Sequence, residues 1–218
     1  MNPQLIPIKK DADTIRKTVL TNVVKMFVSR ENIFEDKAES AIKRVLEYKS
    51  ENNIYKIDLD VPIKNAGSSD TYEGKSVMVN IMAHKVTATN KFPAIKEFLE
   101  NNQKHHKILI FDEVSDKAKH SIENTHNTEV FIESYFMICL AEYTLAPKYK
   151  ILTEDEVQEV LKSYNVTKNQ LKKIMDTDPY SLYYNAKRGQ VFRIICNSEQ
   201  TGKSVGYRIV VKGNITKS

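Results

Sequence analysis

Cysteine is scarce in this 218-residue chain, and long apolar runs are absent. The two cysteines, Cys139 and Cys196, lie in apolar segments, which favours burial as reduced thiols over a disulfide framework. No stretch approaches the roughly 18 apolar residues that span a bilayer, and the N-terminal MNPQLIPIKK has no signal-peptide core. These absences predict a soluble intracellular protein with no membrane partner.

Motifs that carry cofactor or nucleophilic chemistry are missing. Thr201-Gly202-Lys203-Ser204 resembles the end of a phosphate-binding loop, but Asn197 stands where an earlier glycine is required, and the segment connects two predicted strands instead of leading into a helix. There is no nucleophile elbow, dinucleotide fingerprint or catalytic cysteine signature. The histidines lack zinc spacing, so we interpret them as surface or core residues: His84, His105, His106, His120 and His126. We expect no cofactor and no bound metal.

Four carboxylates at strand edges leave one catalytic alternative open. Asp58, Asp60, Asp112 and Glu113 are residues of the kind that hold magnesium in a nuclease-like α/β site. However, no lysine stands beside them at a convincing catalytic spacing. A magnesium-dependent nuclease is therefore a minor alternative.

Positive charge is concentrated at the C-terminal end of the chain. The net charge is +5, with 41% hydrophobic and 28% charged residues, which is typical of a globular protein. Residues 1–146 hold 20 basic and 21 acidic residues, whereas residues 147–218 hold 13 and 7. Pro147 lies at this shift, so we predict domains 1–146 and 147–218. Such asymmetry indicates an acidic partner or nucleic acid near the basic part.

Periodicity predicts an α/β unit in the first domain. Apolar residues at helical spacing predict helices from Asp11 to about Arg30 and from about Asp36 onward, and alternating patterns then predict strands over 57–61 and 77–83. The remaining predicted elements are a helix over 91–102, a strand over 107–111, a helix capped by Ser115 and a strand over 129–132. Residues 134–140 fit either a strand or a helix.

The second domain is predicted from explicit helix-start signals. Thr153 with Glu156, and Thr167 with Gln170, form capping boxes that should each open a helix. Asp178 and Pro179 should begin another helix, with Lys187 and Arg188 in its last turn and Gly189 ending it. A strand over 190–196 should then pair antiparallel with a strand over 205–211. Capping explains Asp178, Pro179 and Gly189 without any functional role.

The residues of this second domain resemble a known family. The match comprises Leu145, Pro147, Lys148, Leu161, Tyr164, Asn169, Gln170, Leu171, Ile174, Asp178, Pro179, Tyr183, Lys187, Arg188, Gly189, Val191, Ile194, Ile195, Ser198, Glu199, Gly202, Tyr207 and Arg208. In order and spacing, this set resembles the fifth common subunit of eukaryotic RNA polymerases, which is similar to the corresponding archaeal polymerase subunit. Asn185 and Ala186 depart from the family pattern of a glycine and an apolar residue.

The resemblance implies a fold and a division of labour. In that family the N-terminal part is a restriction-endonuclease-like α/β jaw domain without nuclease activity, and the C-terminal part is a small mixed α/β assembly domain that ends in a β-hairpin. The family's Thr-Pro-Ser-Ala turn beside downstream DNA matches residues 115–118, where Asp116 replaces the proline and would repel phosphate. We therefore predict Ser115, Lys117 and Lys119 as DNA-proximal residues. The predicted docking residues are Lys187, Arg188, Arg193, Tyr207 and Arg208.

The functional expectation is a non-catalytic subunit of a multisubunit DNA-dependent RNA polymerase. It should anchor on the largest subunit, contact other polymerase subunits, form part of the jaw at downstream duplex DNA, and not form a homo-oligomer. A cellular protein of this kind would be nuclear, and a viral one would occur in host cytoplasm, viral factory or virion. A stand-alone DNA-binding transcription regulator is the main alternative, and it would bind duplex DNA by itself with a steep salt dependence.

Overall fold

The computed structural model describes residues 11–48, 53–63, 75–87, 92–140, 147–198 and 202–213. Two compact units, Met1–Cys139 and Leu140–Ser218, make up the chain and are described separately. The domain boundary predicted after residue 146 borders residues 141–146, which lie outside the described part, so it stays a prediction. None of the described helices is long and apolar enough to cross a bilayer.

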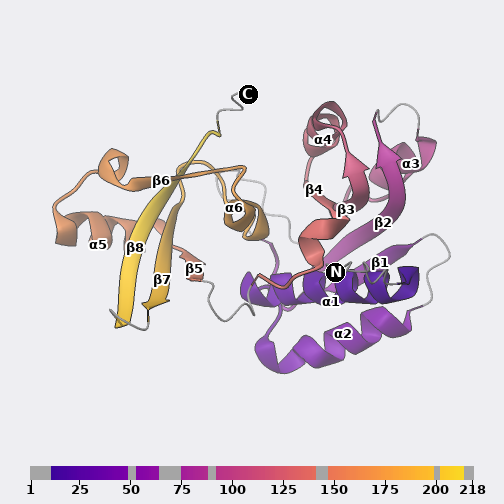
Figure 1. The fold of residues 1–218 in the computed structure, drawn as a ribbon, viewed down its shortest axis with the longest axis horizontal. Helices are drawn as coiled ribbons and strands as arrows, with labels where there is room; N and C mark the ends of the chain where they lie inside the picture. The colour runs from indigo at the N-terminus through magenta and orange to yellow at the C-terminus, as the bar shows by residue number, and fades with distance from the viewer. Residues whose placement is uncertain are drawn as a thin grey trace, which may run out of the picture. The chain divides into compact units, whose positions relative to one another are not determined.

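The first unit is a four-stranded sheet with helices on both faces (Figure 1). The sheet order is β1-β2-β3-β4, with bounds β1 (Ile54–Asp58), β2 (Ser76–Val86), β3 (His106–Val114) and β4 (Thr128–Ile132). β1 runs antiparallel to β2, whereas β2, β3 and β4 are parallel. The helical segments are α1 (Ala12–Ser29), η1 (Glu35–Lys37), α2 (Ala38–Glu47), α3 (Pro93–Asn101), α4 (Asp116–Glu123) and η3 (Glu133–Phe136). The predicted α/β class is confirmed.

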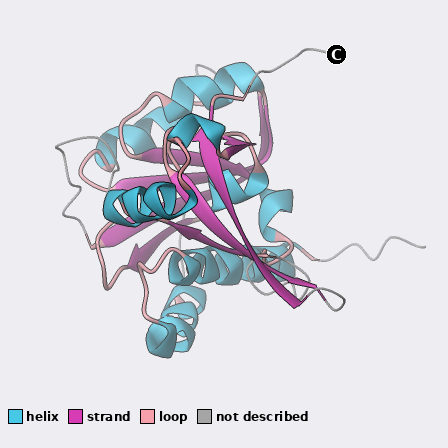
Figure 2. Cartoon of the chain, turned by 90° about the vertical axis from the view of Figure 1, so that its left-hand side faces the viewer, coloured by secondary structure: helices cyan, strands magenta, loops and turns pink. Residues whose placement is uncertain are grey.

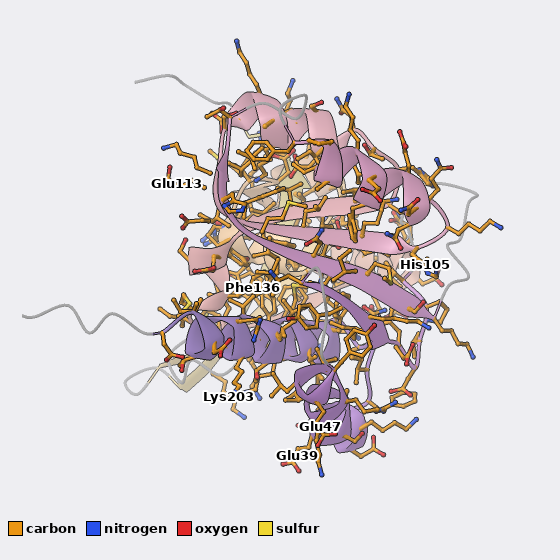
Figure 3. The ribbon with its side chains drawn as sticks, turned by 90° about the vertical axis from the view of Figure 1, so that its right-hand side faces the viewer. Glu39, Glu47, His105, Glu113, Phe136 and Lys203 are labelled. Atoms are coloured by element: carbon orange, nitrogen blue, oxygen red, sulfur yellow. The ribbon has the colours of Figure 1, made fainter. Side chains whose placement is uncertain are left out.

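Different helices cover the two faces of this sheet. α3 and α4 pack on a core that includes Leu109 and Phe111 of β3, and α1 and α2 lie on the other side (Figure 1). Phe136, in the segment that fitted either strand or helix, belongs to η3, and its carbonyl accepts a hydrogen bond of 2.7 Å from buried Asn22 of α1 (Figure 3). Glu39 and Glu47 lie on the exposed side of α2 (Figure 3).

The second unit is a four-stranded mixed sheet of order β5-β7-β8-β6. Its elements are β5 (Lys148–Ile151), α5 (Glu154–Tyr164), η4 (Lys168–Gln170), β6 (Lys172–Met175), α6 (Pro179–Tyr183), β7 (Val191–Ser198) and β8 (Gly202–Val211). The antiparallel β7–β8 pairing confirms the predicted hairpin, which is the long magenta ribbon in front in Figure 2. β5 pairs antiparallel with β7, and β6 pairs parallel with β8; neither edge strand was predicted.

A helix covers each face of the second sheet. Val157 of α5 packs on Val191 and Ile209, and the residues around α6 pack on Phe192 and Val210. Neighbouring residues of β7 and β8 point to opposite faces because side chains alternate along a strand. We call the two surfaces the α5 face and the α6 face.

Two predicted helices differ from the structure. The Thr167 capping box forms, but only the single turn η4 follows, because the chain then enters β6. α6 ends at Tyr183, and Asn185 takes the left-handed conformation with φ 49°. The Ala186 N–H donates to the Ser181 carbonyl and the Asn185 N–H to the Leu182 carbonyl, which is the Schellman pattern. Lys187 and Arg188 therefore lie beyond the helix, contrary to the prediction.

Candidate functional site

The predicted DNA-proximal residues surround the start of α4. Ser115 is the N-cap, as predicted: its hydroxyl accepts the Ala118 N–H at 3.3 Å and donates to the Thr87 carbonyl at 2.8 Å. Lys119 lies 3.7 Å from Glu123. Lys117 is exposed and forms no ion pair within the described ranges. The Ser115 hydroxyl is engaged within the fold, and the Lys119 charge lies near Glu123. Among the described residues, Lys117 is therefore the member of the trio whose charge has no carboxylate partner.

The predicted structural trio shapes the approach to β7. Asp178 accepts the Tyr180 N–H at 2.9 Å, and Pro179 occupies the first helical position. Gly189 has φ +86°, and nothing lies within 4 Å of the place where a Cβ would stand. Its N–H donates to the Val210 carbonyl at 2.9 Å. The backbone conformation, and not a lack of space, therefore requires glycine at this position. Gly189 ends a turn after α6 and does not end the helix itself.

Two of the predicted docking cations have partners inside the unit. Lys187 donates to the Asn185 side chain at 2.6 Å, and Arg188 Nε donates to Asp176 at 2.7 Å. The other carboxylate oxygen of Asp176 accepts the Gly213 N–H at 2.8 Å. Burial raises the pKa of Asp176, but the Gly213 N–H and Arg188 outweigh it and lower the pKa overall. Arg188 therefore holds the turn against Asp176, which follows β6 and also binds Gly213 just after β8.

The other predicted docking residues belong to the hairpin and divide between its faces. Arg193 of β7 lies directly opposite Tyr207 of β8, so both point to the α5 face. Arg208 lies opposite Phe192 and points to the α6 face. Arg193 and Arg208 are exposed, and neither forms a side-chain hydrogen bond or ion pair with any residue in the part of the chain that the structure describes. The five residues therefore do not form one patch.

An aromatic cluster on the α6 face was not predicted. The Tyr149 ring stacks on Tyr180 at 4.1 Å between centroids, and Tyr149 meets Phe192 edge to face at 5.4 Å. Burial, followed by the nearby Asp178 charge, raises the pKa of Tyr149. The cluster was missed because it depends on β5, a four-residue edge strand whose KYKI pattern is too short to predict.

A buried charge cluster in the first unit was also missed. Glu129 of β4 accepts hydrogen bonds from both terminal nitrogens of Arg30 at 2.9 and 2.8 Å, and it lies 2.6 Å from His106 Nε2. The three side chains are at most 9% exposed. Burial alone would raise the pKa of Glu129, but the Arg30 charge and the His106 contact hold it far below its ordinary value. We call these residues the Arg30 triad. It confirms that His106 is a core histidine.

Three of the four carboxylates considered for magnesium, Asp58, Asp60 and Glu113, are engaged separately. Asp60 accepts the Phe34 N–H at 3.1 Å and Lys37 Nζ at 2.7 Å, which lowers its pKa. Asp58 lies 3.6 Å from Lys56, and Glu113 forms a salt bridge with Lys85. Among the described residues there is no group of three His, Cys, Asp or Glu side chains that could hold a metal ion. Gly202–Ser204 begins strand β8, so the Thr201–Ser204 tetrapeptide does not lead into a helix; Thr201 itself lies outside the described residues.

Comparison with known proteins identifies the family. Residues 138–210 match the family described as "RNA polymerase Rpb5, C-terminal domain". The chain is 27% identical to DNA-directed RNA polymerase subunit 5 of Acanthamoeba polyphaga mimivirus over 210 residues, which cover 96% of this chain and 98% of the relative. It is 41% identical over 73 residues to DNA-directed RNA polymerase subunit Rpo5 of Methanocaldococcus jannaschii, covering 34% of this chain and 94% of the relative.

A nematode relative is matched over a shorter part of its length. Subunit RPABC1 of DNA-directed RNA polymerases I, II and III from Caenorhabditis elegans is 32% identical over 119 residues, which cover 53% of this chain and 56% of that protein. The archaeal match covers 94% of that relative at 41% identity. The chain belongs to the RNA polymerase subunit 5 family.

Proposed function

We propose that the chain is a non-catalytic subunit of a multisubunit DNA-directed RNA polymerase. The observation that carries this proposal is the match to the mimivirus polymerase subunit, which extends over 96% of this chain and 98% of that protein. Support for a non-catalytic role comes from Asp60, because its carboxylate is engaged within the fold by Lys37 and the Phe34 N–H. Nucleotidyl transfer would then take place on other subunits.

The second unit would serve as the anchor on the largest polymerase subunit. Its sequence carries the family match, and its exposed Arg193 and Arg208 have no ion-pair partner among the described residues. Tyr207 lies beside Arg193, while Lys187 and Arg188 flank the turn before β7. Aromatic and arginine side chains are favoured in protein interfaces. This unit would therefore meet protein, although charge count alone would suggest nucleic acid.

The first unit would form part of the jaw at downstream duplex DNA. Lys117 offers an exposed charge beside the N-terminus of α4, with Lys119 two positions further along. Asp116, in the first turn of the same helix, would oppose a phosphate. We therefore place Lys117 closest to DNA and give Ser115 the role of holding the helix start. A cellular subunit would act in the nucleus, and a viral one in host cytoplasm, viral factory or virion.

Purification of the tagged full-length chain from its native source tests this function. Stoichiometric recovery with the large polymerase subunits is expected. Recovery of the chain without them would refute the proposal. In that case, duplex binding by the chain alone with a steep salt dependence would favour a DNA-binding regulator, and DNA cleavage lost on Asp60→Asn would favour a nuclease.

A further inference from the structure

Among the described residues, α5 covers only part of the α5 face of the second unit. The pair Val191 and Ile209 packs under Val157 of α5, and Tyr207 of the next pair toward the hairpin tip also packs against this cluster. Ile195 and Val205, which form the following pair, do not belong to it. β7 and β8 extend past α5 at their lower ends in Figure 1. We call the area from the Arg193–Tyr207 pair toward the tip the hairpin face. It consists of Lys148, Arg193, Ile195, Lys203, Val205 and Tyr207.

Apolar groups occupy the centre of the hairpin face. Val205 is 43% exposed, and its opposite neighbour Ile195 is half-buried. The Tyr164 ring at the end of α5 is 61% exposed and meets the Tyr207 ring edge to face at 5.7 Å. β-strands that leave apolar residues on a sheet face gain stability when another element covers them. The centre of this surface is thus suited to a packed partner.

Three exposed cations surround that apolar centre. Lys148 lies opposite Ile195, Arg193 lies opposite Tyr207, and Lys203 precedes Val205 by two positions on the same side. All three are exposed, and none forms a salt bridge within the described ranges. An occupant of this face should therefore carry negative charge.

α5 provides a model for such an occupant. It is an amphipathic helix with three acidic residues in its first turn, and its Glu156 lies 2.9 Å from Lys150 in the row adjoining the covered one. The part of the sheet nearest α5 is thus packed and neutralised by an acidic helix. Lys150 lies opposite Arg193, so α5 reaches the Arg193–Tyr207 row through Glu156. From this row to Lys203 the strands advance about 14 Å, and one helix is about 10 Å across, so a single further helix fits beside α5.

We propose that the hairpin face binds an acidic amphipathic α-helix of another polymerase subunit, packed beside α5. This inference rests on the proposed function and specifies its docking partner. Nucleic acid is a poorer fit, because protein contacts to DNA are made mainly with phosphate and sugar by charged and polar groups, whereas the middle of this face is apolar.

Site-specific crosslinking tests which face is occupied. A photo-crosslinking amino acid replaces Val205 in the tagged full-length chain, and in the matched control it replaces Ser204, which is exposed on the opposite face of the same strand. After purification with the polymerase, mass spectrometry should find a crosslink from position 205 to a helical segment rich in acidic residues. Position 204 should not reach that segment. A crosslink from 205 to nucleic acid or to a non-helical segment would overturn the proposal.

A substitution pair provides a second measurement. Val205→Glu places negative charge in the apolar centre, and we expect it to weaken association with the polymerase about tenfold or more, whereas Ser204→Glu should retain wild-type affinity. Equal affinities of the two variants would refute the face assignment. Circular dichroism verifies that both variants fold.

The two proposals fail in different ways. If the unaltered chain recovers polymerase subunits but neither measurement singles out position 205, the proposed function stands and the helix site is wrong. If the unaltered chain recovers no polymerase subunits, both proposals are wrong.

Discussion

The Arg30 triad makes a strong prediction about stability. Glu129→Gln removes the negative charge that the buried Arg30 guanidinium contacts through two hydrogen bonds. The arginine side chain is 5% exposed, so water cannot replace the lost carboxylate. Removal of one partner from a buried ion pair costs about 3–5 kcal/mol, mainly because the remaining charge is left uncompensated.

The expected size of the effect can be checked by thermal or chemical unfolding. For a chain of this size, about 3 kcal/mol corresponds to a fall of roughly 6–12 °C in the melting temperature. Circular dichroism and native-state hydrogen exchange should both register it, and protection of the β3–β4 amides should fall most. Glu47→Gln is the matched control, because its partner Lys43 lies 3.9 Å away and both side chains are more than half exposed; it should not differ measurably from wild type.

The double variant Arg30→Met, Glu129→Gln separates electrostatics from packing. Since the second change removes the charge that the first leaves unpaired, the double variant should be less destabilised than the sum of the single variants by about 1–3 kcal/mol. Additive effects, or a melting temperature for Glu129→Gln equal to that of wild type, would refute the view that the triad is a coupled buried ion pair.

Three further predictions concern other parts of the chain. Arg188→Glu should weaken assembly with the largest polymerase subunit. The comparison variant Asp176→Asn disturbs the same internal contact but leaves the Arg188 charge unchanged, so it separates docking from fold maintenance. Equal losses of polymerase binding by the two variants in a pull-down would make Arg188 structural only. Gly189→Ala should lower the unfolding free energy by about 1 kcal/mol because φ is +86° at this position. At Gly206 nothing lies within 4 Å of an added Cβ and φ is not positive, so Gly206→Ala should not lower the unfolding free energy. Urea titrations of the two variants measure the difference. Lys107 is 1% exposed, and burial lowers its pKa, so the folded state holds this proton less tightly than the unfolded state does. The unfolding free energy of wild type should therefore rise as pH increases toward the ordinary pKa of 10.5, and Lys107→Met should lose that rise.

Acidification provides an independent check on the triad. The folded-state pKa of Glu129 lies below the ordinary value of 4.5, so the stabilisation is present above that value and is lost as pH falls toward the folded-state pKa. The unfolding free energy of wild type should therefore decrease from about pH 5 downward. Glu129→Gln should show a shallower decrease, and identical slopes for the two proteins would contradict the assignment.

Local signals in the sequence were sufficient to predict the starts of helices. Asp11, Ser115 and Asp178 accept backbone N–H groups from residues two or three positions later, so each cap depends only on adjacent chain. The Thr153 capping box is equally local. Helix ends were less predictable: Asn185, and not Gly189, terminates α6, because a left-handed asparagine can make the same turn.

Contacts between distant residues could not be predicted. Arg30, His106 and Glu129 are far apart in the sequence, and each alone resembles a surface residue. Only the β3–β4 register and the path of α1 bring them together. Likewise β5 and β6 are four-residue edge strands, KYKI and KKIM, whose alternation is too short to distinguish from a loop. Without β5, neither the Tyr149 stack nor the place of Lys148 on the hairpin face could be inferred.

The structure changes the meaning of the charge excess in the second unit. Lys150, Lys168 and Arg188 bind carboxylates of the same unit, at 2.9, 3.2 and 2.7 Å. Those cations help to hold helices and turns on the sheet, and each already has a carboxylate partner within the unit. Arg193 and Arg208, in contrast, remain exposed on opposite faces of the hairpin. Around Arg193, exposed cations that form no ion pair with the described residues border the exposed apolar side chain of Val205. That combination, and not the net charge, favours a protein helix as the partner.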